Sequence, residues 1–189
     1  REPTHPGAIH YTIHANDVDT RATKSLEVVR SYAEIAPAVP HALHMPTHIF
    51  VRLGEWPDVI DWNRKAADAA LRFPAPDGIS NHYAHALDYL VYAYLQRGED
   101  AQALAVIEEI SAKDEPFQGT FTGAFHLAAM PARYAVERRA WSEALALTPR
   151  TPTSVKWDRF WWAESVSWFA RGLGAAHTGD ASEAERSDR

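Results

Sequence analysis

The chain of 189 residues contains no cysteine. Disulfide bonds, thiolate nucleophiles and zinc sites built from sulfur are therefore excluded, and any metal ion must be held by imidazole and carboxylate groups. The nine glycines are scattered, and no glycine-rich loop follows a predicted strand, so no phosphate-binding loop is indicated. Histidine, in contrast, is abundant: there are ten, and nine of them lie before position 130.

Positive charge is scarce as well. The 19 Lys and Arg residues are outnumbered by 25 Asp and Glu, and no basic stripe offsets the formal charge of −6, so nucleic acid is excluded as the main partner. No apolar run approaches the roughly 18 residues of a membrane-spanning helix, and no secretory signal opens the chain. We therefore expect a soluble, cytoplasmic protein with no membrane partner.

The first residue is Arg1 and not Met, and the sequence ends in "ASEAERSDR" without a clear stop. We expect a single domain over 1–189 that is a piece of a longer polypeptide, so a signal peptide ahead of Arg1 would change the expected compartment. Neighbouring repeats of that longer chain, or a second copy of the chain in a homo-oligomer, would then be partners.

An internal repeat runs through the chain. The stretches "RLGEWPDVI", "QRGEDAQAL", "ERRAWSEAL" and "HTGDASEAE" align on one position, the anchor, which is held by Gly54, Gly98, Arg139 and Gly179 at steps of 44, 41 and 40 residues. A small or branched apolar residue follows each anchor by five positions. Each anchor separates two segments with helical periodicity, and no convincing strand alternation is present.

These segments predict an all-α fold, a right-handed α-solenoid of about five antiparallel helical hairpins. Pro46 falls inside one predicted helix and is expected to bend it. A buried stripe is predicted on the last long helix from the helical spacing of Trp161, Ser165, Trp168 and Gly172. The predicted helices span 6–15, 20–36, 40–53, 57–73, 80–97, 100–113, 119–138, 141–147, 159–178 and the segment from 180 onward.

The anchor pattern resembles the tetratricopeptide repeat family, with "HIFVRLGEWPDVIDWNRKA" and "YLVYAYLQRGEDAQALAVI" as its best matches. The family's usual unit has about 34 residues. The units here are longer, and Arg139 replaces one anchor glycine. The chain is also similar to uncharacterised bacterial repeat proteins with a histidine-rich opening like "HPGAIHYTIHAND", which implies no chemistry. The resemblance to the repeat family implies a concave face lined by the first helix of each hairpin, with ligand contacts 13, 10, 6 and 3 residues before the anchor.

Histidine recurs at one of these positions, because His41, His85 and His126 each lie 13 residues before an anchor. His44 and His48 extend the same helical face in the first of these units. Packing alone gives no reason for one residue type to recur at one position of three units. The repeat therefore indicates a groove with a function carried by histidine.

A transition-metal site is one interpretation, because neutral imidazole is a preferred ligand of Zn, Cu, Fe and Ni. Histidines four residues apart on a helix can chelate one ion, and ligands from adjacent helices can converge. The predicted ligands are His10, His14, His44, His48, His85 and Asp88. The other predicted groove residues are His41, His82, Tyr92, His126 and Arg133. An open coordination position would allow, as an alternative to simple binding, a metal-dependent hydrolase or oxidase.

Three further interpretations use no metal. The groove could bind a peptide or protein partner through its histidines, tyrosines and Arg133, with an affinity that changes as histidine titrates. His85 and Asp88, spaced i, i+3, could form an acid–base pair. Each histidine taken singly could be a packing or capping residue. We expect the groove to bind a transition-metal ion or a peptide or protein.

Overall fold

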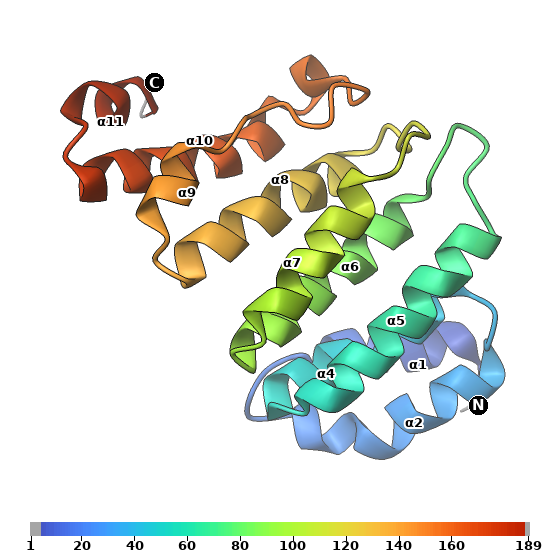
Figure 1. Ribbon diagram of the computed structural model, residues 1–189. Helices are drawn as coiled ribbons and strands as arrows, with labels where there is room; N and C mark the ends of the chain where they lie inside the picture. The colour runs from blue at the N-terminus through green and yellow to red at the C-terminus, as the bar shows by residue number, and fades with distance from the viewer. Residues whose placement is uncertain (1–4, 188–189) are drawn as a thin grey trace.

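The computed structural model describes residues 5–187 and is all-α, as predicted (Figure 1). Within these residues the only β-type pairings are two isolated bridges, Ala75 with Gly78 and Ile79 with Phe117. No helix among them is both long and apolar enough to cross a membrane. The helices are α1 (Pro6–Asn16), α2 (Leu26–Ile35), α3 (Pro40–His44), α4 (Pro46–Leu53), α5 (Trp56–Arg72), α6 (Asn81–Gln96), α7 (Asp100–Ser111), α8 (Phe121–Glu137), α9 (Trp141–Leu145), α10 (Trp161–Thr178) and α11 (Ala181–Ser187), with 3₁₀ turns η1 (Ala22–Ser25) and η2 (Trp157–Arg159).

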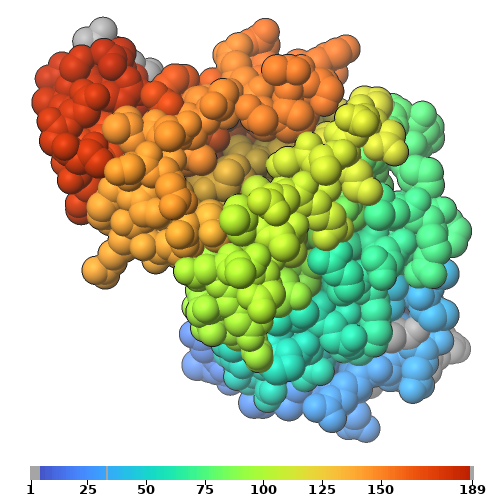
Figure 2. Space-filling model, in the orientation of Figure 1, coloured from blue at the N-terminus to red at the C-terminus, as the bar shows by residue number. Residues whose placement is uncertain are grey.

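Helices that follow one another in the chain pack together. They form a series from the α1 and α2 end to the α10 and α11 end (Figure 1), and the colour bands of the space-filling view follow the same order (Figure 2). Alternate helices also touch: α1 contacts α4, α3 contacts α6, α6 contacts α8, and α8 contacts α10. These helices therefore form one row, in which a side chain on each can meet side chains on the next.

The four anchors share one backbone geometry at the ends of these helices. The φ angles are +71° at Gly54, +68° at Gly98, +54° at Arg139 and +84° at Gly179, all in the left-handed region. In each case the next residue donates its N–H to the carbonyl five positions back, in the pairs Glu55–Phe50, Glu99–Tyr94, Ala140–Ala135 and Asp180–Ala175. This is a helix cap that favours glycine, which explains the spacing seen in the sequence.

Two apolar clusters hold the row in place. Small residues of α5, such as Ala66 and Ala70, let α6 approach closely and bury Tyr83 and Leu87. A second cluster lies around Ile13 of α1 together with Met45, Ile49, Phe50 and Val59. Because Ile13 is buried, the side of α1 that carries it faces α4. Polar residues next to Ile13 on α1 therefore lie at the same interface.

Two details of the predicted helices differ from the structure. The predicted helix 40–53 is divided, because Pro46 has no N–H to donate and α3 ends at His44. Met45 keeps helical dihedral angles (φ −52°, ψ −40°), so the chain passes directly into α4. The first turn of the predicted helix 20–36 is the 3₁₀ turn η1.

The stripe predicted to be buried on α10 is wrong. Trp161 is 69% exposed, and the side of α10 that is buried carries small or polar residues: Ala163, Glu164, Ser167, Ala170 and Gly174. The reason is close helix packing. A Cβ atom added at Gly174 would lie 2.5 Å from the backbone nitrogen of Leu145, so α9 approaches α10 where no large side chain would fit.

Candidate metal centre

Eight of the ten histidines form one continuous cluster on the row of helices. Each lies next to another, with ring centroids 4.7 Å apart for His10–His14, 5.1 Å for His10–His41, 5.3 Å for His41–His82, 5.4 Å for His14–His48, 4.9 Å for His44–His48, 4.1 Å for His44–His85 and 4.5 Å for His85–His126. Two histidines lie outside the cluster. His5 caps the start of α1, and His177 stacks on Trp141.

His44, on α3, is held by a residue of α5. Its Nδ1 lies 2.7 Å from Oδ1 of Asn63 on α5, and both residues are buried. The amide nitrogen of Asn63 donates to the carbonyl of Val59, so the amide oxygen faces the ring. The hydrogen of His44 is therefore on Nδ1, and Nε2 carries a lone pair.

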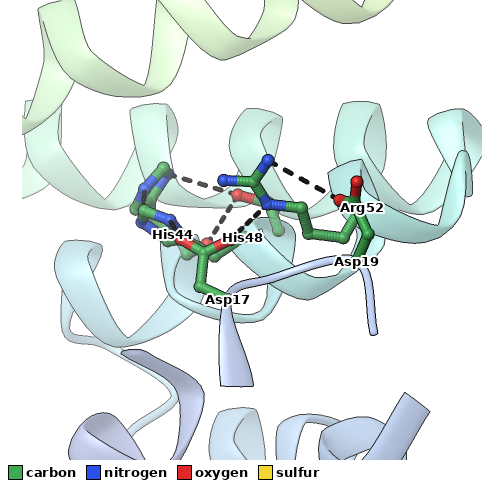
Figure 3. A network of polar contacts seen from close by, with 6 residues as sticks. Asp17, Asp19, His44, His48 and Arg52 are labelled. Atoms are coloured by element: carbon green, nitrogen blue, oxygen red, sulfur yellow. Dashed lines mark hydrogen bonds and ion pairs between the residues drawn. The ribbon is translucent and has the colours of Figure 1, made fainter. Parts of the chain in front are cut away.

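His48, one turn further along on α4, is held in the same way by a carboxylate. Its Nδ1 lies 3.0 Å from Oδ2 of Asp17, which follows α1, and Oδ1 of Asp17 accepts a 2.8 Å hydrogen bond from Arg52 (Figure 3). These hydrogen bonds lower the pKa of Asp17 to about 2, so it is ionised at neutral pH. The ionised carboxylate keeps the hydrogen of His48 on Nδ1 and leaves a lone pair on Nε2.

His85, on α6, is held through a second imidazole. Asp88 accepts a hydrogen bond from Nδ1 of His126 on α8, at 2.8 Å, and Arg133 lies 3.3 Å from the same carboxylate. His126 therefore presents a lone pair on Nε2, which accepts the hydrogen on Nδ1 of His85 at 2.7 Å. The nitrogen of His85 left uncommitted is Nε2. Tyr92 lies beneath Arg133, with its ring 5.0 Å from the guanidinium carbon.

One nitrogen from each of three imidazole rings lies at one place. His44, His48 and His85, which we call the inner histidines, each offer a ligand atom, and these atoms lie within 4.8 Å of one another. The Nε2 atoms of His44 and His48 are 3.1 Å apart. Two nitrogens bound to one tetrahedral zinc ion at about 2.0–2.1 Å would be about 3.3 Å apart. The pair is therefore already spaced for a shared ion.

Burial keeps the imidazoles of His44 and His85 neutral. It lowers the pKa of His85 to about 2 and the pKa of His44 well below its usual value, and the neighbouring imidazoles add to both shifts because positive charges so close would repel. Burial also raises the pKa of Tyr89 to about 12; its ring lies against all three inner histidines. Burial and the neighbouring imidazoles therefore disfavour an additional proton between His44 and His48. A neutral imidazole keeps the lone pair that a metal ion needs.

Nine of the eleven residues predicted for the site belong to this cluster or contact it, whereas Arg133 contacts Asp88 and Tyr92 packs on Arg133. His44, His48 and His85 converge on one point. Asp88 does not lie with them: it contacts His126, and the acid–base pair expected for His85 and Asp88 is a chain of three groups with His126 in the middle. From α1, His14 lies next to the inner His48, and His10 lies next to His14 and His41. The remaining groove residues, His41, His82, Tyr92, His126 and Arg133, surround these positions.

Two residues that hold the inner histidines were not predicted. Asn63 is a buried polar residue on the apolar side of α5, four positions after Val59, and this break in the apolar pattern was a usable signal. Asp17 lies in the turn after α1, 31 residues before His48. No spacing rule connects those two positions, so only the fold could reveal this contact.

No known family model matches the chain, and no curated protein matches it significantly. What the histidine cluster can bind is therefore derived from its geometry alone.

Proposed function

We propose that this chain is a transition-metal-binding domain in which His44, His48 and His85 hold one ion through their Nε2 atoms. The observation that carries the proposal is that each of the three rings has its other nitrogen bound: to Asn63, to Asp17 and to His126. Metal-binding histidines in proteins commonly donate their second N–H to a carbonyl or carboxylate in this way, which fixes the ring and raises its basicity.

The ligand set indicates the class of metal. Three imidazole nitrogens suit Zn, Cu, Fe or Ni, whereas Ca and Mg prefer oxygen ligands. The carboxylate of Asp17 contacts His48 directly, and that of Asp88 reaches His85 through His126, so both supply charge without occupying the site. Their negative charge would favour a cation at the centre of the neutral imidazoles.

We further propose that the helices form a right-handed solenoid of the tetratricopeptide type, with the site on the face made by the first helix of each hairpin. The four identical caps at regular spacing support this proposal, as do the contacts between alternate helices. The inner histidines would then join two consecutive hairpins, with a third hairpin supplying His126.

Metal titration tests the function. We expect protein purified without a histidine tag, stripped by chelator and dialysed, to bind one equivalent of Zn or Co(II) tightly, with Co(II) absorption bands of a nitrogen-ligated, low-coordinate ion. A His44→Gln/His48→Gln variant should lose this binding, and the matched control His177→Gln should keep it. Equal titration curves for all three proteins, with circular dichroism showing that each is folded, would reject the proposed site.

A catalytic centre is a second candidate, because three protein ligands leave a coordination position open for water or substrate. Metal-loaded protein would then act as a hydrolase or oxidase, with Tyr89 beside the open position. Hydrolysis of an activated ester by the zinc form, or oxygen consumption by the copper or iron form, measures this. Activity that His48→Gln does not remove would come from elsewhere. A peptide-binding groove is supported less well, because the inner rings face one another.

A further inference from the structure

Four histidines of the cluster do not belong to the inner site or its supports. His10, His14, His41 and His82, which we call the outer histidines, extend from the inner site toward the surface over α1, α3 and α6. Among the described residues, none donates to or accepts from their ring nitrogens, and Nδ1 of His41 is buried without a partner. Rings that serve only packing would leave a buried nitrogen of this kind unsatisfied at a cost.

The spacing of the outer histidines fits successive two-ligand positions for a metal ion. Two imidazoles on one tetrahedral ion, bound at about 2.0–2.1 Å, have ring centroids about 5 Å apart. The pairs His10–His14, His10–His41 and His41–His82 lie at 4.7, 5.1 and 5.3 Å. His14 and His48 are 5.4 Å apart, so this series reaches one of the inner histidines directly.

Exposure decreases along the same series. His14 is exposed, His10, His41 and His82 are half-buried, and His44 is only 2% exposed. A hydrated ion therefore meets imidazoles at the surface before it can reach the inner nitrogens. Within 5–187 the outer rings also lack the hydrogen bonds that fix the inner ones, so they are free to turn as an ion passes.

We infer that the outer histidines are the route by which a metal ion enters and leaves the inner site, through successive exchange of one neutral imidazole ligand for the next. This inference rests on the proposed function of the inner histidines. Each step replaces one metal–nitrogen bond or one bound water by another metal–nitrogen bond, and no redox change or proton transfer is required. The route begins at His14 and His10 and ends at His48 and His44.

Stopped-flow uptake of Co(II), and its release to an excess of chelator, test the route. A route affects the rates of binding but not the free energies of the free and metal-bound protein. The rate constants of Co(II) uptake and release should therefore both fall several-fold, by the same factor, in the His10→Gln/His14→Gln variant. Its dissociation constant should equal that of the unchanged protein. His177→Gln is the matched control and should change neither rate. His41→Gln/His82→Gln removes the other two outer histidines and is the second test variant. Circular dichroism reports the fold of each protein.

The outcomes separate the two proposals. Uptake and release at unchanged rates in both double variants, while Co(II) still binds tightly, would overturn the route and leave the inner site standing. A raised dissociation constant in His10→Gln/His14→Gln would also overturn it, because these residues would then be ligands of the bound ion. Failure of the unchanged protein to bind Co(II) would overturn the inner site and the route together.

Discussion

The Nε2 atoms of His44 and His48 face each other at 3.1 Å, and neither nitrogen carries a hydrogen, because Asn63 and Asp17 accept from the opposite sides of the two rings. Two lone pairs directed at one another repel, so this pair is stable only with a cation nearby or at a cost to the fold. Substitutions at the supporting residues Asn63 and Asp17 therefore test the site as directly as substitutions at the histidines.

Asp17→Asn should weaken metal binding by about 10–100-fold, the range found when a second partner of a metal-bound histidine is removed. The amide keeps the size of the side chain but loses the charge that holds His48. Isothermal titration with zinc measures the change. Asp19→Asn is the matched control, because Asp19 is exposed and lies 3.8 Å from Arg52 without touching a histidine. Equal affinities for the two variants would contradict the role of Asp17.

Asn63→Leu should lower the free energy of unfolding of the metal-free protein by about 1–3 kcal/mol, because His44 would keep a buried N–H without an acceptor. It should also weaken metal binding, since the ring of His44 is no longer fixed. Urea unfolding followed by circular dichroism gives the first quantity and zinc titration the second. A variant as stable as the unchanged protein would show that the ring finds another tautomer or partner.

The metal-free protein should lose stability as the pH falls below about 6.5. Burial lowers the pKa of His41 to about 4 and that of His85 to about 2, whereas histidine in an unfolded chain titrates near 6.5. The unfolded state therefore binds protons first, and the free energy of unfolding decreases as the pH falls from about 6.5 toward these values. The lowered pKa of Asp17, about 2, adds a loss only further down, below the pKa of an unfolded aspartate.

Urea midpoints at about pH 8, 6.5 and 5 measure this decrease. His41→Gln should reduce the slope below pH 6.5, and His177→Gln, which alters a histidine outside the cluster, should not. A free energy of unfolding that stays constant from about pH 8 to pH 5 would mean that the clustered histidines titrate alike in the folded and unfolded chain.

Arg139→Gly should stabilise the protein by about 1 kcal/mol, because an L side chain in the left-handed region is strained by roughly that amount. Arg139 has φ +54° at a helix cap where the three other anchors carry glycine. The reverse change, Gly98→Ala at φ +68° with no atom near the new methyl group, should destabilise the protein by a similar amount. Thermal unfolding measures both. Equal melting temperatures for Arg139→Gly and the unchanged protein would show that the cap is not strained.

The sequence predicted most helix positions and the shared face of the histidines, because both follow from local periodicity. Pro40 lies at a predicted helix start, and the anchors end helices in the left-handed conformation that glycine favours. Histidine spacing of 13 residues before an anchor identified one position on successive helices. These features depend on residues a few positions apart, which a sequence displays directly.

Contacts between distant segments were not predictable in the same way. Asp88 was expected to be a ligand or a partner of His85, three residues before it, but the packing of α6 on α8 places it against His126. On α10, hydrophobicity suggested a buried Trp161, whereas close approach of α9 at Gly174 buries the small residues instead. Steric fit between helices decided both cases, and no pattern within one helix records that fit.

The support of His44 by Asn63 has a consequence for how the chain unfolds. Ligands and supports come from the turn after α1, from α3 and α4, from α5, from α6 and from α8. An ion at the centre would therefore link five segments of the chain through one point. Local opening of the first two-thirds of the chain would then require loss of the ion, while α10 and α11, which contribute no group to the centre, would open independently. We therefore expect zinc to slow amide hydrogen exchange in the segments up to α8 and to leave exchange in α10 and α11 unchanged.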